Sequence, residues 1–272
     1  CGLLIETPDL KIAYSGDIRL HGYRENDTIN FCKESKNCDV LLIEGVSVSF
    51  QDFGEKLREN EAENEEELIE KIKKYANDVD VSLVEKAYYF GKKAHDGQFR
   101  KSGEPYFIHP VAVANILCDM ELDIETIIAG LLHDIAKEMT KEESLEYVEK
   151  NNIAIDEVEK INVSLLHGKI GAHIAKTLYD VSEQIQKAIE YHTETSPNMD
   201  ELAKIIYVSD KIERNRKSEK FDLDAERELA RKDLDGAVLF IIDASIEKLV
   251  KKEKLMHPTI VKTRNKLLME RM

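Results

Sequence analysis

The sequence has no long apolar run, no excess of positive charge and no clustered cysteines, and each absence excludes a class of protein. No apolar run reaches the roughly 18 to 20 residues that a membrane-spanning helix needs, so we expect no membrane as a partner. The formal net charge is −15, and such a field repels nucleic acids and anionic lipids. A metal ion and a few local cations can still hold the phosphates of a small molecule. We therefore expect a small-molecule partner and no nucleic acid.

The cysteines and the first residues bear on where the protein works. Cys1, Cys32, Cys38 and Cys118 form no CxxC pair and match no zinc-ribbon spacing. Plain thiols of this kind are typical of a reducing cytoplasm. The chain begins at Cys1 without Met and without a basic stretch. We expect no signal peptide, a cytoplasmic location and a natural start further upstream.

Three segments with different patterns follow one another along the chain. Short apolar runs bounded by Pro, Gly, Asp or Asn predict a β-rich segment over residues 1–54. Residues 55–79 are acidic and predict a solvated helix or a linker. Over residues 80–272 apolar side chains recur at helical spacing, so the fold class is mainly α, preceded by a small β-rich segment. We expect three helices between residues 80 and 133. Further helices are expected near 141–150, 168–180, 183–192, 199–211, 225–252 and 259–271.

The strongest chemical signal is a His-Asp dipeptide at the end of an apolar helix. His133 and Asp134 follow the run Ile124–Leu132. Two strongly hydrated side chains are costly there unless something satisfies them, and a divalent metal ion accepts both imidazole and carboxylate ligands. A hydrogen-bonded core histidine beside a capping aspartate is the simpler alternative. His109, which opens the preceding helix, and Asp210, which closes a later apolar helix, favour the metal.

This order of residues, His then His-Asp then Asp on a helical chain, resembles the HD superfamily of metal-dependent phosphohydrolases. The resemblance implies an HD-domain helical bundle over residues 80–272, in which His109, His133, Asp134 and Asp210 ligate one metal ion. It favours iron, while the ligand chemistry also suits manganese, cobalt or zinc.

From about residue 131 to 272 the chain resembles the YqeK group of symmetrical dinucleoside-tetraphosphate hydrolases. The matching stretches are Leu131–Glu138, Leu166–Lys169, Tyr191–Thr193, Pro197–Met199, Asp210–Arg216 and His257–Pro258. The resemblance implies that diadenosine tetraphosphate is cut into two ADP, and it leaves a homodimer open. Asp134 would orient or deprotonate the attacking water, and Lys137 would stabilise phosphate charge. The implied substrate contacts are His167, His192, Thr193, Arg216, Lys254, His257 and Pro258.

The stretch before this, about residues 84–130, resembles a different family. Residues 94–110 read AHDGQFRKSGEPYFIHP and are similar to the RelA/SpoT hydrolase domain, which degrades guanosine alarmones. That family follows its His-Asp with a Glu-Asp pair that handles the attacking water, whereas this chain has Ala136, Lys137 and Glu138 in the corresponding places. An alarmone 3′-pyrophosphohydrolase, or a nucleotide-binding protein with an impaired site, are therefore the alternatives.

The first fifty residues carry a third resemblance, to the second half of a metallo-β-lactamase-type hydrolase. It rests on residues 13–22 and 42–45, and in that family the counterpart of Asp17 bridges two metal ions. The HxHxDH motif that supplies the other ligands is absent, so we expect no active metal site there. Three resemblances in one chain fit a natural fusion or an artificial chimera.

Overall fold

The chain divides into two compact units, Cys1–Ser49 and Phe50–Met272. A computed structural model describes residues 65–76, 79–100, 103–213 and 223–272, together with three strands of the first unit. These strands are β1 (Leu3–Glu6), β2 (Lys11–Tyr14) and β3 (Val40–Leu42). β1 pairs with β2 antiparallel and β2 with β3 parallel. The strands fall within the predicted apolar runs. Asp17 lies outside the described residues, so its resemblance stays a prediction.

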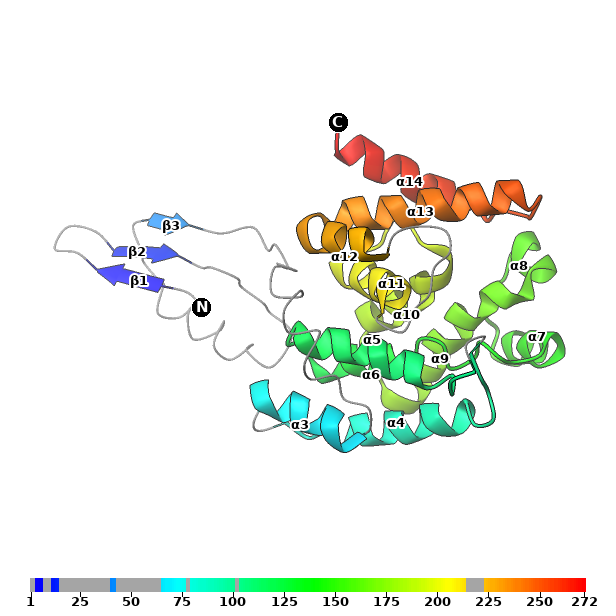
Figure 1. Cartoon of the computed structure of the whole chain (residues 1–272), viewed down its shortest axis with the longest axis horizontal. Helices are drawn as coiled ribbons and strands as arrows, with labels where there is room; N and C mark the ends of the chain where they lie inside the picture. Colours follow the sequence, from blue (N-terminus) through cyan, green and yellow to red (C-terminus); the bar gives the residue numbers. More distant parts are fainter. Residues whose placement is uncertain are drawn as a thin grey trace. The chain divides into compact units, whose positions relative to one another are not determined.

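The second unit is a bundle of helices (Figure 1), which confirms the predicted mainly helical fold class. Its described elements are α3 (Glu65–Tyr75), α4 (Ser82–Ala94), α5 (Ile108–Asp119), α6 (Ile124–Leu132), α7 (Lys141–Lys150), α8 (Glu157–Ile161), the 3₁₀ helix η2 (Val163–Leu166), α9 (His167–Tyr179), α10 (Glu183–Glu194), α11 (Glu201–Ile212), α12 (Leu223–Lys232), α13 (Leu234–Lys251) and α14 (Pro258–Glu270). Within the described ranges, no helix combines the length and the apolar character that crossing a bilayer requires.

Helices α5 and α6 form the centre of the bundle and lie side by side (Figure 1). Asp123 caps α6 by accepting a hydrogen bond from the backbone N–H of Thr126 at 2.8 Å. The helix is buried along its whole length apart from its first turn, as its apolar sequence predicts. A Cβ atom at Gly130 would lie 2.7 Å from Leu117 Cδ1 of α5, so glycine permits the close approach of these two helices. The start of α5 lies near the end of α6, where His109 Nε2 is 3.3 Å from His133 Nε2.

The predicted helix or linker at residues 55–79 needs one correction. Its described part forms α3, and Leu68 and Ile72 of this helix are fully buried, both 0 % exposed. Lys71 reaches α5, where its Nζ atom lies 3.1 Å from Asn115 Oδ1 and 2.8 Å from Asp119 Oδ1. The helical core therefore begins at α3, before the expected boundary at residue 80. Apolar side chains at i and i+4 outweigh the acidic composition of the segment.

A second correction concerns the helix expected at residues 225–252. The structure contains two helices, α12 and α13, which are separated at Asp233. Asp233 has non-helical backbone angles, and its side chain accepts a hydrogen bond from the backbone N–H of Gly236 at 2.8 Å. The short acidic side chain thus caps α13 and stops the continuous helix.

Candidate metal centre

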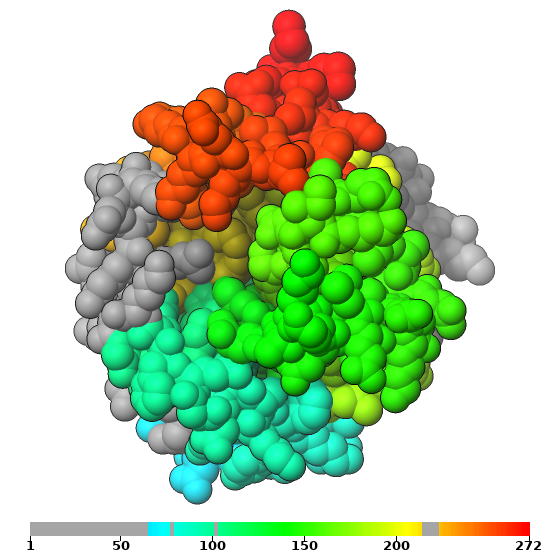
Figure 2. All heavy atoms as spheres, turned by 90° about the vertical axis from the view of Figure 1, so that its right-hand side faces the viewer, coloured from blue at the N-terminus to red at the C-terminus, as the bar shows by residue number. Residues whose placement is uncertain are grey.

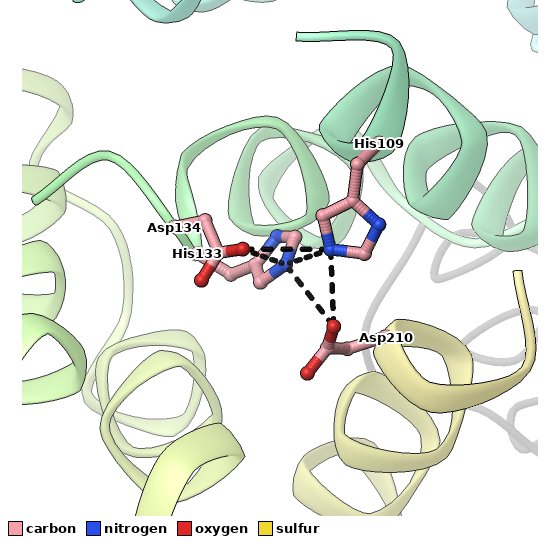
Figure 3. Close-up of side chains that lie close together, drawn as sticks. All are labelled: His109, His133, Asp134 and Asp210. Atoms are coloured by element: carbon pink, nitrogen blue, oxygen red, sulfur yellow. Dashed lines mark hydrogen bonds and ion pairs between the residues drawn. The ribbon is translucent and has the colours of Figure 1, made fainter. Parts of the chain in front are cut away.

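Four of the predicted residues converge at the helix ends (Figure 3). His109 comes from the first turn of α5, His133 and Asp134 directly follow α6, and Asp210 lies in the last turn of α11. His109 Nε2 lies 3.0 Å from Asp210 Oδ1, 3.4 Å from Asp134 Oδ2 and 3.3 Å from His133 Nε2. All four residues are buried, and one ligand atom from each lies within 4.8 Å of the others. The group could hold a metal ion.

A second group of possible ligands shares Asp134 with the first. His167 Nε2 lies 3.3 Å and His192 Nε2 lies 3.4 Å from Asp134 Oδ1, while Oδ2 of the same carboxylate faces His109. These three residues also satisfy the geometry of a metal site. A carboxylate with one oxygen on each side can bridge two cations. From the sequence, His167 and His192 were expected to contact substrate, whereas the structure places both imidazoles against Asp134.

The histidines are oriented so that their Nε2 atoms face the carboxylates. Nδ1 contacts a backbone carbonyl oxygen in three of them: His133 with Gly130 at 2.7 Å, His167 with Ser164 at 2.6 Å and His192 with Ile189 at 2.6 Å. A carbonyl only accepts, so Nδ1 carries the proton and the lone pair lies on Nε2. In His109, Nδ1 lies 3.3 Å from Glu213 Oε1. Imidazoles held in this way are prepared to bind a metal ion through Nε2.

The electrostatics of the first group also fit a cation. Burial lowers the pKa of His133 to about 3, so this ring is neutral. Burial also disfavours a charged His109 ring, but hydrogen bonds with Asp134, Asp210 and Glu213 outweigh it and raise the pKa of His109 to about 10. One proton on His109 therefore partly compensates the buried carboxylates. A divalent ion would supply more positive charge between the same atoms and would displace that proton.

Two side chains donate directly to the shared carboxylate. Lys137 Nζ lies 2.7 Å and Tyr106 OH 2.6 Å from Asp134 Oδ2. Burial would raise the pKa of Asp134, but the charge of Lys137 and the hydrogen bonds from its neighbours hold it well below the ordinary value. Lys137 keeps 33 % of its side chain exposed, so its ammonium group can also reach a solvent-borne phosphate. Lys211 makes an ion pair with Asp210.

The sequence analysis gave no role to Glu213, which the structure places beside the centre. Its side chain is fully buried and lies between His109 Nδ1, at 3.3 Å, and Arg100 Nη2, at 2.7 Å. A carboxylate behind a metal-binding histidine fixes the ring and raises its basicity. The sequence contained a signal for this role. Glu213 lies three positions after Asp210 at the end of the same helix, so the two side chains lie on neighbouring faces of that helix.

The other predicted substrate contacts lie elsewhere or outside the described residues. Thr193 and His257 line a cavity whose lining includes none of the six possible metal ligands. His257 caps α14, with Nδ1 2.6 Å from Thr259 Oγ1. Lys254 is exposed and Pro258 is the first residue of α14. Arg216 is not among the described residues, so its role stays a prediction.

The face shown in Figure 2 is hollowed near its centre. Yellow atoms of the α11 region lie at the floor of the hollow, and teal, green and orange segments form its rim (Figure 2).

A helical bundle with buried His and Asp groups that suit a divalent cation is the architecture of a metal-dependent hydrolase. The HD domain family matches residues 106–215. A crystal structure of a "predicted HD superfamily hydrolase involved in NAD metabolism" from Clostridium acetobutylicum aligns with a TM-score of 0.61 and 30 % identity, covering 69 % of this chain and 97 % of that one. The chain belongs to the HD superfamily of phosphohydrolases, as the order of its His and Asp residues predicted.

Curated relatives match a shorter stretch and come from alarmone metabolism. A GTP pyrophosphokinase of Myxococcus xanthus is 40 % identical over 94 residues, which is 34 % of this chain and 12 % of that protein. The guanosine-3′,5′-bis(diphosphate) 3′-pyrophosphohydrolase of Vibrio cholerae is 45 % identical over 78 residues, 28 % of this chain and 11 % of that protein. The bifunctional (p)ppGpp synthase/hydrolase SpoT of Escherichia coli is 47 % identical over 73 residues, which is 27 % of this chain and 10 % of that protein. The match thus spans about a tenth of each relative.

Proposed function

We propose that this protein hydrolyses a phosphoanhydride bond of a nucleotide, and that its substrate is diadenosine tetraphosphate, cut symmetrically into two ADP. The observation that carries the proposal is the position of Lys137, whose ammonium group contacts Asp134 within the two possible metal-ligand groups. A cation at this point favours a substrate with many phosphate charges. The YqeK-like stretches that follow Asp134 support the same substrate.

We propose that the two ligand groups hold divalent ions. His109, His133, Asp134 and Asp210 would hold one, and Asp134, His167 and His192 a second. When bound, such ions supply Lewis-acid polarisation of phosphate oxygens and lower the pKa of water toward neutrality. Iron is the metal that the YqeK-like resemblance favours, and manganese, cobalt and zinc accept the same ligands.

The side chains around the centre would divide the remaining work. Lys137 would donate to a phosphate oxygen and offset the negative charge that builds on it during the reaction. Asp134 would orient the attacking water through a hydrogen bond, while Tyr106 keeps that carboxylate in place at 2.6 Å. Glu213 would fix the His109 ring through Nδ1. Arg216 would pair with a distal phosphate, as the resemblance implies.

Guanosine alarmones are the second candidate substrate, and the relatives favour them. The alarmone 3′-pyrophosphohydrolase of Vibrio cholerae and SpoT are 45 % and 47 % identical to this chain over their short matches. The RelA/SpoT-like stretch also supplies three groups near the centre, namely Arg100, Tyr106 and His109. Against this substrate, Lys137 occupies the place where that family has an acidic residue for the attacking water.

A direct comparison of the two substrates tests the proposal. Protein loaded with iron or manganese is incubated with diadenosine tetraphosphate or with the guanosine alarmone at equal concentration, and products are resolved by ion-exchange chromatography. We expect ADP as the only product of the first substrate, formed faster than pyrophosphate is released from the second. ATP plus AMP, or faster pyrophosphate release, would overturn the assignment. Lys137→Glu restores an acidic residue, so it should lower the rate on the tetraphosphate more than the rate on the alarmone.

A further inference from the structure

Helices α9 and α10 border the cavity that Thr193 and His257 line. Its volume is about 340 Å³, and its lining includes none of the six possible metal ligands. Lys169 lies two positions after His167, and Glu194 lies two positions after His192. Two positions correspond to about 200° around an α-helix. The cavity therefore lies on the opposite face of these helices from the metal centre.

The ammonium group of Lys169 already lies in the lining of the cavity. The atoms around this ammonium group show what kind of ligand the cavity favours. Lys169 Nζ lies 2.6 Å and 2.8 Å from the two carboxylate oxygens of Glu159 and 2.9 Å from the carbonyl oxygen of Ala154. Glu159 is 0 % exposed. The ammonium group donates hydrogen bonds to Glu159 Oε2 and to the Ala154 carbonyl oxygen, and it forms an ion pair with Glu159 Oε1.

Two further carboxylates in the lining lack such a cation. Glu190 and Glu194 are four positions apart on one face of α10, where like charges repel. In the described part of the chain, no lysine or arginine lies within ion-pair distance of either one. The carboxyl group of Glu194 lies 3.7 Å from His257 Nε2 and shares a hydrogen bond with the carboxyl group of Glu159. Burial raises the pKa of both carboxyl groups, and that of Glu194 to about 8. Oε1 of Glu194 is buried without a hydrogen-bond partner.

A threonine of the lining gives an independent indication of a missing ligand. Thr195 follows α10, lines the cavity and is only 3 % exposed. Its hydroxyl oxygen has no hydrogen-bond partner. A buried polar group normally has one, because leaving it unpaired costs about 1–3 kcal/mol. A ligand with N–H donors would satisfy this oxygen together with Glu194 Oε1.

We propose that this cavity binds a small organic cation with a primary ammonium group, of the diamine or polyamine class. One ammonium group would lie between Glu190 and Glu194 and donate to Thr195, in the way that Lys169 is held by Glu159. A metal ion fits less well, because no three carboxylate or imidazole atoms of this lining converge as they do at the described metal groups. The volume is at the lower end of the range for small-molecule sites.

Binding is measured on the whole metal-loaded protein by isothermal titration calorimetry with 1,4-diaminobutane and with spermidine. We expect one molecule bound per chain. Glu194→Gln and Glu190→Gln should each weaken binding by roughly tenfold or more, because an amide cannot ionise to form a charge-assisted hydrogen bond with the bound ammonium group. Thermal unfolding of each variant verifies that it is folded.

The matched control is Glu183→Gln, which removes the same charge from the exposed first turn of the same helix. It should leave the affinity unchanged. Equal weakening in all three variants would mean that the diamine is only attracted by the negative net charge of the protein, and the proposal would then be wrong. Absence of binding at millimolar diamine, or displacement of the diamine by an equal concentration of Mg²⁺, would also overturn it.

Discussion

Each of two opposite faces of the α9 and α10 pair contacts a buried carboxylate from another helix region. The side chains that surround the carboxylate differ between the two faces. On one face Asp134 meets the Nε2 atoms of His167 and His192, which are lone-pair donors. On the other face Glu159 meets the ammonium group of Lys169, which only donates protons. A carboxylate that faces several imidazoles suits a metal ion, whereas carboxylates beside an unpaired hydroxyl suit an N–H donor. The partners, more than the carboxylates, define what each face can bind.

The largest effect is expected from a substitution at the metal-binding face. Asp134→Asn removes the charge of the carboxylate that both ligand groups share, so bound metal should be lost and hydrolysis should fall by roughly a hundredfold or more. Elemental analysis and the product assay measure the two quantities. His133→Ala and Asp210→Ala should lose metal as well. His192→Ala touches only the second group and should retain part of the metal. Full metal occupancy in Asp134→Asn would contradict the shared site.

On the cavity face, the corresponding change should affect folding and not chemistry. Lys169→Met leaves Glu159 buried without its cation, which should cost about 3 kcal/mol of unfolding free energy. Urea titration measures this cost, and the metal content of the folded variant should be unchanged. Lys187→Met, which breaks the exposed pair with Glu183, is the control and should not change the urea midpoint measurably. An equal loss in both variants would remove the distinction between the two faces.

A more moderate effect is expected from the residue behind the metal face. Glu213→Gln keeps the shape but weakens the hold on His109 Nδ1, so metal affinity or activity should fall by roughly 10- to 100-fold. Arg100→Lys retains a cation beside Glu213 and should have a smaller effect. A metal titration of both variants separates affinity from turnover. Wild-type affinity in Glu213→Gln would show that the contact does not position the ring.

A gradual effect is expected from a pH dependence of stability on the cavity face. Burial raises the pKa of Glu194 to about 8, from 4.5 in an unperturbed carboxyl group. Between these values the folded protein retains a proton that the unfolded chain has released, so this residue lowers stability progressively as the pH rises. Glu194→Gln removes the carboxyl group that titrates. Its Tm relative to the parent should therefore increase from pH 5 to pH 8, while Glu183→Gln should show no such increase.

The sequence was most informative where the physical signal was local. Runs such as Ile124–Leu132 predicted a buried helix, and the structure has α6 over those residues. It was less informative where long-range packing competes with composition. The acidic stretch before residue 79 contains Leu68 and Ile72 at helical spacing, and their burial makes α3 part of the core. A single capping residue, Asp233, divided the helix expected at 225–252.

The sequence by itself determined the helical class and four of the six residues able to hold a metal, because periodicity and polar side chains at apolar helix ends are properties of neighbouring residues. Only the tertiary structure decided how these residues combine. Asp134 and His192 lie far apart in the sequence, and the packing of α6 against α10 brings them within 3.4 Å. The packing of α11 against α5 placed Glu213 behind His109, and that of α9 against α10 brought Lys169 and Glu194 to one cavity, with Glu159. Contacts of this kind depend on which helix faces meet, and no local pattern specifies that.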